Sequence, residues 1–186
     1  MFEVIKQYSY LGFTHVIPLG FDHILFILSI FLMNTNLKTI IVQCSAFTIA
    51  HSISLGLSAA DLFVVDSKII EPLIAISILV TALENIVQEK INKWRIVIIL
   101  LFGIIHGLGF ANALRETGLD KSHFYLSLLF FNVGVECGQI LIILLAYYSI
   151  GKWFCDKKWY KNRIVYPISS VIGLIAIYWT IERIFS

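Results

Sequence analysis

Charged residues are scarce in this chain. They make up 14% of its 186 residues, against 59% hydrophobic residues, and the mean hydropathy is +0.87. In a soluble globular domain about a quarter of the residues are charged. No stretch is long or polar enough to form a soluble domain, a linker or a disordered tail. The composition therefore predicts an integral membrane protein with a single domain over residues 1–186.

The chain also lacks the signatures of several other classes. Its apolar runs do not alternate polar and apolar residues, so they do not predict the strands of a membrane β-barrel. The first run is too long for a signal peptide and has no small-residue cleavage site, so we expect no removable leader. The three cysteines have no CxxC spacing and are interpreted as small apolar core residues.

Long apolar runs are what the chain has in place of charge. A helix of about 20 apolar residues crosses the roughly 30 Å hydrocarbon core of a bilayer. Runs of this kind lie at about residues 12–34, 38–60, 67–88, 94–114, 122–149 and 165–184. We therefore predict an all-α, polytopic membrane protein, a bundle of about six transmembrane helices joined by short loops.

Lysine and arginine are distributed unevenly between the two sets of loops. Nine of the 14 basic residues follow the first, third and fifth runs: Lys38, Lys90, Lys93, Arg95, Lys152, Lys157, Lys158, Lys161 and Arg163. Because cytoplasmic loops carry the excess of positive charge, we expect both termini on the extracytoplasmic side of a bacterial inner membrane. Topology alone accounts for the basic loops, so no nucleic-acid partner is indicated.

The first run carries three side chains that are costly to bury in a bilayer. They are His15, Asp22 and His23, in the segment THVIPLGFDHILF. In one straight helix His15 and Asp22, seven residues apart, would share a face. Pro18 lies between them and favours a break, because proline suits the first turn of a helix and disrupts its interior. Such a break would let His15 fold back over a site as a lid or an entry ligand.

Three more ionisable side chains lie deep in later runs. His51 belongs to a polar stripe of the second run, and His106 lies within the Gly103-x-x-x-Gly107 packing motif of the fourth. Glu136 is far from both ends of the fifth run, where an unpaired charge costs about 2.5–3.5 kcal/mol. Such a carboxylate needs a partner, a proton or a metal ion.

The positions of these polar residues along their runs predict that they lie at one level of the expected bundle, in its outer half. Imidazole and carboxylate groups are ligands that Ni²⁺, Co²⁺ and Zn²⁺ accept, and a bound ion also offsets the cost of burying charge. The predicted ligands of the divalent metal ion are His15, Asp22, His23, His51, His106 and Glu136. We expect Thr48, Ser52, Asn132 and Gln139 to orient them.

Glu84 and Asn85 end a polar stripe near the cytoplasmic end of the third run. Two interpretations of Glu84 stay open. In the first it is an interfacial carboxylate near Lys90 or Lys93. In the second it is an inner relay on an ion pathway, with Asn85 beside it.

Five ordered motifs resemble the successive signatures of the HupE/UreJ family of bacterial membrane proteins, in its second branch. They are GFDHILF, FTIAHSISL, ALEN, FGIIHGLGFA and FNVGVECGQ, and they cover about residues 11–150. The resemblance implies an accessory permease for nickel or a similar divalent metal, usually encoded with hydrogenase or urease genes. Its functional positions fall on His15, Asp22, His23, His51, Glu84, His106, Asn132, Glu136 and Gln139.

Three functions fit these observations, and the favoured one is a nickel- or cobalt-type permease that captures the ion at the outer site and passes it inward past Glu84. The second is an intramembrane zinc-type metalloenzyme, a hydrolase or acyl transferase on a lipid or lipid-linked substrate, with Glu136 or Asp22 as general base. The third is a structural or assembly protein whose polar groups only join helices. The expected partners are a metal ion and the lipid bilayer, and self-association into a homo-oligomer stays open.

Overall fold

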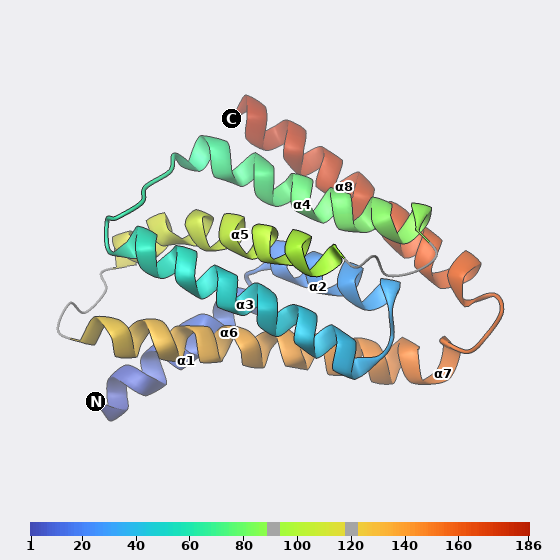
Figure 1. Ribbon diagram of the computed structural model, residues 1–186, viewed down its shortest axis with the longest axis horizontal. Helices are drawn as coiled ribbons and strands as arrows, with labels where there is room; N and C mark the ends of the chain where they lie inside the picture. The colour runs from blue at the N-terminus through green and yellow to red at the C-terminus, as the bar shows by residue number, and fades with distance from the viewer. Residues whose placement is uncertain (89–93, 118–122) are drawn as a thin grey trace.

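The computed structural model describes the backbone of residues 1–88, 94–117 and 123–186, and the side chains of these residues except 112–117. Its helices are α1 (Phe2–Val16), α2 (Phe21–Met33), α3 (Leu37–Ala59), α4 (Ser67–Val87), α5 (Arg95–Thr117), α6 (Phe124–Ala146), η2 (Tyr147–Gly151), α7 (Lys152–Phe154), η3 (Lys161–Val165) and α8 (Tyr166–Phe185). The long helices run along one axis of the molecule (Figure 1). The predicted all-α fold is confirmed.

Within the described residues, four helical segments are long and apolar enough to cross a membrane: Leu37–Ala59, Ser67–Val87, Phe124–Phe154 and Lys161–Phe185. The bent pair formed by α1 and α2 gives a fifth if it is counted as one span. The part of α5 from Arg95 to Ala111 is a shorter apolar helix. The six predicted runs therefore match helices of the bundle, and the predicted count of about six spans is approximate.

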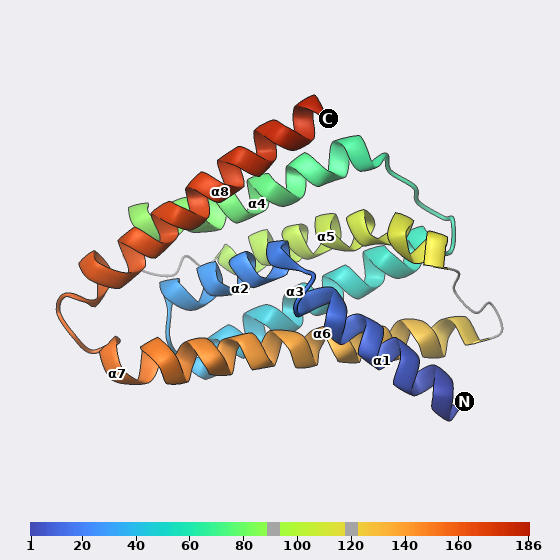
Figure 2. The ribbon, with the colours of Figure 1, turned by 180° about the vertical axis from the view of Figure 1, so that it is seen from behind.

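The helix is interrupted between α1 and α2, as the position of Pro18 predicts. The two helices are bent by 67° at this break. Ile17 has an extended backbone (φ −128°, ψ 120°), because a proline disfavours the helical conformation in the residue before it. After the break α2 runs into the middle of the bundle, while α1 lies across α6 (Figure 2).

Small residues let the helices pack closely in pairs. α3 packs against α5, α1 against α6, and α4 against α8. A Cβ atom on Gly107 of α5 would overlap the carbonyl of His51 in α3. A Cβ atom on Gly134 of α6 would overlap the carbonyl of Ser9 in α1. Both glycines are therefore needed for the backbones to approach this closely, which brings the polar side chains of facing helices together.

Both termini lie at one end of the bundle, and α2, α4 and α6 end at the other (Figure 1). The loops that follow these three helices are those in which the sequence concentrates lysine and arginine. Lys90 and Lys93 of that set lie outside the described residues. The extracytoplasmic location of the termini stays a prediction.

The outside of the bundle is apolar, whereas polar side chains lie inside it. Exposed residues on α3 include Ile49 and Ile53, and those on α8 include Leu174 and Ile177. The buried polar residues include histidine, serine, threonine and asparagine on several helices. This distribution fits a lipid environment, in which polar groups must find partners within the protein.

Candidate metal site

Three histidine side chains meet beside the break between α1 and α2. They are His15 in the last turn of α1, His23 at the start of α2, and His51 in α3. Each offers a ring nitrogen, and these atoms all lie within 4.8 Å of one another. Three imidazoles at this spacing could hold one metal ion. We call them the histidine group.

The bend between α1 and α2 makes this group possible. In a continuous helix, His15 and His23 would be separated by about 12 Å along the axis, at 1.5 Å per residue. In the structure their ring centroids are 4.7 Å apart. The break at Pro18 therefore brings two residues that a continuous helix would hold about two turns apart into contact.

His106 of α5 lies next to the histidine group, with its ring centroid 5.3 Å from that of His23. Its Nδ1 atom is 2.8 Å from the carbonyl oxygen of Phe102. A carbonyl only accepts hydrogen bonds, so this contact assigns the proton to Nδ1. The lone pair of Nε2 is then available to a ligand.

Asn132 of α6 has a similar relation to His51. The Asn132 amide nitrogen donates to the carbonyl of Leu128 at 2.8 Å, which directs its Oδ1 atom toward the ring. Oδ1 lies 3.4 Å from Nδ1 of His51. The acceptor at this position favours a proton on Nδ1 of His51 and leaves its Nε2 atom with a free lone pair.

The Nε2 atoms of His15, His23, His51 and His106 share a further property. All four are buried, and none has a hydrogen-bond partner in the part of the chain that the structure describes. A buried polar atom without a partner costs about 1–3 kcal/mol. Four such atoms on neighbouring imidazoles are suited to a ligand that accepts electron pairs, such as a metal ion.

Aromatic side chains surround the imidazoles. The ring of Phe47 lies 5.0 Å from that of His106, the ring of Phe26 lies 5.6 Å from it, and the ring of Phe110 lies 3.8 Å from that of His15. An apolar shell of this kind limits water and strengthens the interaction between an ion and its ligands.

A cavity of about 360 Å³ lies beside the histidines, and its wall includes His15, His23 and His106. Glu71 near the start of α4 and Arg183 in the last turn of α8 also line it, so it lies toward the end of the bundle that carries the termini. We call it the outer cavity.

Asp22 lines the outer cavity and is bound there by Arg183. The Nη2 atom of Arg183 donates to both carboxylate oxygens, at 3.0 and 3.1 Å. Its Nη1 atom donates to the carbonyl of Glu71, also at 3.1 Å. The structure therefore places Asp22 in an ion pair beside the histidine group, and not within the set of atoms that lie within 4.8 Å of one another.

Glu136 contacts α3 at Ser45, whose hydroxyl donates to Oε1 at 2.6 Å. Its Oε2 atom is buried and has no partner among the described residues. Gln139, one turn later on α6, is fully buried, and neither of its amide atoms has a partner there. Both side chains therefore keep hydrogen-bonding atoms available to a ligand.

Thr48 and Ser52 bond to their own helix. The Thr48 hydroxyl donates to the carbonyl of Cys44 at 3.1 Å, and the Ser52 hydroxyl donates to the carbonyl of Thr48 at 2.6 Å. Because these hydroxyl protons bond to carbonyls one turn back along α3, they are not donated to the imidazoles. Their expected role in orienting the histidines is not seen in these contacts.

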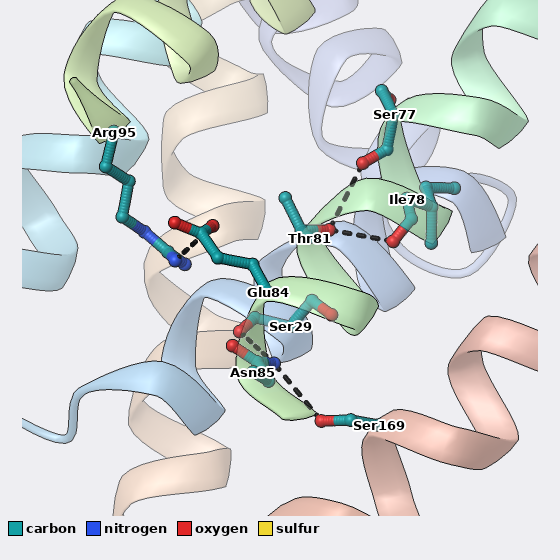
Figure 3. Close-up of polar contacts among 8 residues, drawn as sticks. All are labelled: Ser29, Ser77, Ile78, Thr81, Glu84, Asn85, Arg95 and Ser169. Carbon is teal, nitrogen blue, oxygen red and sulfur yellow. Dashed lines mark hydrogen bonds and ion pairs between the residues drawn. The ribbon is translucent and has the colours of Figure 1, made fainter. Parts of the chain in front are cut away.

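Glu84 forms a buried ion pair with Arg95 at the start of α5 (Figure 3). The Nη1–Oε2 distance is 2.5 Å, and the side chains are 2% (Arg95) and 7% (Glu84) exposed. The distribution of basic residues in the sequence placed Arg95 in a loop, but in the structure it is buried within the bundle. The one available signal was its position at the start of the fourth apolar run. Lys90 and Lys93, the partners expected for Glu84, lie outside the described residues.

Asn85 joins three helices next to this ion pair. Its amide nitrogen donates to the carbonyl of Ser29 in α2 at 2.9 Å and to the hydroxyl of Ser169 in α8 at 3.2 Å (Figure 3). Neither Ser29 nor Ser169 was predicted to be a partner of Asn85, because serines in an apolar run give no signal of which helix they contact.

The comparison with protein families covers almost the whole chain. The family model described as HupE / UreJ protein matches residues 1–183. Searches of curated proteins and of solved structures give no match. The matched residues include all four histidines of the candidate site. The match shows that this chain belongs to the HupE/UreJ family.

Proposed function

We propose that this protein is a membrane permease for a divalent transition metal ion of the nickel or cobalt type. The observation that carries the proposal is the set of four neighbouring, buried Nε2 atoms that have no partner among the described residues. Neutral imidazole nitrogens suit Ni²⁺, Co²⁺ and Zn²⁺, whereas Mg²⁺ and Ca²⁺ prefer oxygen ligands. Membership of the HupE/UreJ family supports the same class of ion.

The outer cavity supports transport. An ion that enters it meets the partly exposed carboxylate of Asp22 and the imidazoles of His15, His23 and His106. Glu136, whose Oε2 atom has no partner in the described part of the chain, is a further ligand when the ion moves toward α6. A transported ion must bind strongly enough to enter and weakly enough to leave.

Flux into proteoliposomes tests this function. Vesicles that contain the purified protein are expected to take up Ni²⁺ or Co²⁺ faster than protein-free vesicles, as followed by an enclosed metal-sensitive dye. His51→Ala should reduce this uptake at least tenfold. His123→Ala is the matched control, since His123 precedes α6 and is not part of the histidine group. Protein that binds metal but gives no flux of Ni²⁺, Co²⁺ or Zn²⁺ contradicts the permease.

One observation favours a second function, an intramembrane zinc-type hydrolase or acyl transferase. The histidines border an outer cavity that is lined by Leu11, Leu19 and Phe110 as well as by Asp22, and this wall could accept an acyl chain. Three protein ligands with one open position are typical of catalytic zinc sites. Bound zinc without ion flux, together with zinc-dependent turnover of a lipid-linked ester, would select this function.

Arg183 should weaken the binding of cations to the outer cavity, because its guanidinium lies at the cavity wall and holds Asp22. Arg183→Gln removes this positive charge and frees the carboxylate. We expect the Kd for Ni²⁺, measured by isothermal titration calorimetry, to fall about tenfold, which corresponds to about 1.4 kcal/mol. Arg163→Gln is the control, because Arg163 is exposed in η3, away from the cavity. An unchanged Kd in Arg183→Gln would show that Asp22 and Arg183 do not act on the ion.

A further inference from the structure

A second cavity lies at the other end of the bundle. Its volume is about 110 Å³, and we call it the inner cavity. It is lined by Leu32 and Met33 at the end of α2, Asn85 and Gln88 at the end of α4, and Tyr160, Lys161 and Val165 beside η3. Asn85 is fully buried and keeps an unpartnered Oδ1 atom among the described residues.

Two helices reach both cavities. On α2, His23 lines the outer cavity and Met33 lines the inner one. On α4, Ile74 lines the outer cavity and Asn85 the inner one. α2 and α4 also contact each other. The two cavities are therefore the two ends of one interface between these helices.

Buried polar side chains occupy the interval between the cavities. They are Ser29 on α2 and Ser77, Thr81, Glu84 and Asn85 on α4, each at most 8% exposed. Figure 3 shows that the α4 residues follow one another along the helix. Apolar side chains would pack at this position without any need for partners. Ionisable side chains inside a membrane bundle mark ion pathways, so Glu84 within this run indicates a polar route between the cavities.

The ion pair of Glu84 and Arg95 is only partly satisfied. Arg95 uses Nη1 for its bond to Glu84, while its Nε and Nη2 atoms have no partner in the described part of the chain. Glu84 keeps its Oε1 atom without a partner among these same described residues. Buried ion pairs add little stability unless their remaining hydrogen-bonding groups are also satisfied. This pair therefore suits a role in which one cation replaces another.

We propose that Glu84 is a second, inner binding site for the divalent metal ion, and that the guanidinium of Arg95 occupies this site when the ion is absent. The inference rests on the proposed transport function. The ion binds the free Oε1 atom, Arg95 withdraws from Oε2, and the carboxylate keeps a cationic partner throughout. Thr81 lies one turn before Glu84, and its hydroxyl donates to the carbonyl of Ile78 at 2.8 Å, which leaves the lone pairs of its oxygen for the ion.

The two sites offer different ligand atoms, and this difference favours release of the metal ion at the inner site. The histidine group offers nitrogen atoms, whereas Glu84 and Thr81 offer oxygen atoms. Ni²⁺ and Co²⁺ bind imidazole more strongly than a single carboxylate with a hydroxyl. The ion is therefore held less tightly near the inner cavity than near the outer one, and the returning guanidinium of Arg95 displaces it.

Metal stoichiometry of Arg95→Gln tests the inner site. Glutamine is neutral and still offers an amide donor to Glu84, so the carboxylate keeps a partner when no metal is bound. Equilibrium dialysis against Ni²⁺, followed by elemental analysis, should give a twofold rise, from one ion per chain in the wild type to two. The additional ion should be lost in Glu84→Gln/Arg95→Gln and kept in His51→Ala/Arg95→Gln.

The double variant Glu84→Gln/Arg95→Gln supplies a second, independent measurement. It neutralises both members of the ion pair together, so it leaves no unpaired charge inside the bundle. It should keep the first ion and lose at least tenfold in proteoliposome flux. Flux at the wild-type rate in this variant overturns the inner site, as does a stoichiometry of one in folded Arg95→Gln. Absence of metal from every variant and from the wild type would instead reject the proposed function itself.

Discussion

Replacing His23 with alanine is expected to remove the bound metal ion from the purified protein. His23 is the central imidazole, because its ring centroid lies 4.7 Å from that of His15, 5.3 Å from that of His106 and 5.9 Å from that of His51. Loss of a residue that only orients a ligand costs about 10–100-fold in metal affinity. Loss of the ligand itself should exceed this range, so the affinity for Ni²⁺ should fall more than about 100-fold.

Elemental analysis after dialysis and calorimetric titration with Ni²⁺ measure this loss. His123→Ala, outside the histidine group, should bind as the wild type does. Asn132→Leu provides an intermediate case, because it removes the acceptor beside Nδ1 of His51 but leaves every imidazole in place. Its loss should lie between those of the other two variants. Full metal content in His23→Ala would place the ion elsewhere and would end the proposal for this site.

Gly107→Ala should destabilise the bundle and weaken metal binding together. The new Cβ atom would overlap the carbonyl of His51 and the hydroxyl of Ser54, both on α3. A backbone carbonyl cannot move aside alone, so α5 must move away from α3. Overpacking of this kind typically costs about 1–3 kcal/mol in the free energy of unfolding. His106, the preceding residue, would move with α5 and away from His23.

Gly173→Ala is the matched control for this substitution. A Cβ atom on Gly173 of α8 would meet Leu79 at 3.7 Å and Ala82 at 3.8 Å, which are ordinary van der Waals contacts. Alanine also favours a helix over glycine by up to about 1 kcal/mol. Thermal denaturation in detergent should therefore show a lower Tm for Gly107→Ala and an equal or higher Tm for Gly173→Ala. Equal Tm values for both variants would contradict the close packing of α3 and α5.

Much of the fold was predictable because lipid leaves few choices. Apolar runs of the observed lengths form helices, since each backbone N–H and C=O group must bond within its own segment. The break at Pro18 was predictable for a similarly local reason, because proline acts on its own residue and on the one before it. The extent of the bend was not. The 67° angle depends on how α1 packs against α6 through Gly134.

The polar partners were less predictable than the polar residues. Depth along each run predicted that His15, His23, His51 and His106 lie at similar levels. It did not predict that Asp22 pairs with Arg183, since these residues are 161 positions apart in the chain. Nor did it predict that Glu84 pairs with Arg95, because Arg95 resembles the loop cations that precede it in the sequence.

The sequence by itself determined the class of the protein, its helical segments, its family resemblance and the imidazoles and carboxylates available for an ion. These properties depend on composition and on periodicity within one helix. The tertiary structure decided which side chains meet. Rotation of each helix about its axis, close approach at Gly107 and Gly134, and the bend after Val16 together bring three imidazoles within reach of one ion. They also place Asp22 and Glu84 beside arginines, because a carboxylate buried in an apolar bundle requires a partner and the nearest one depends on packing.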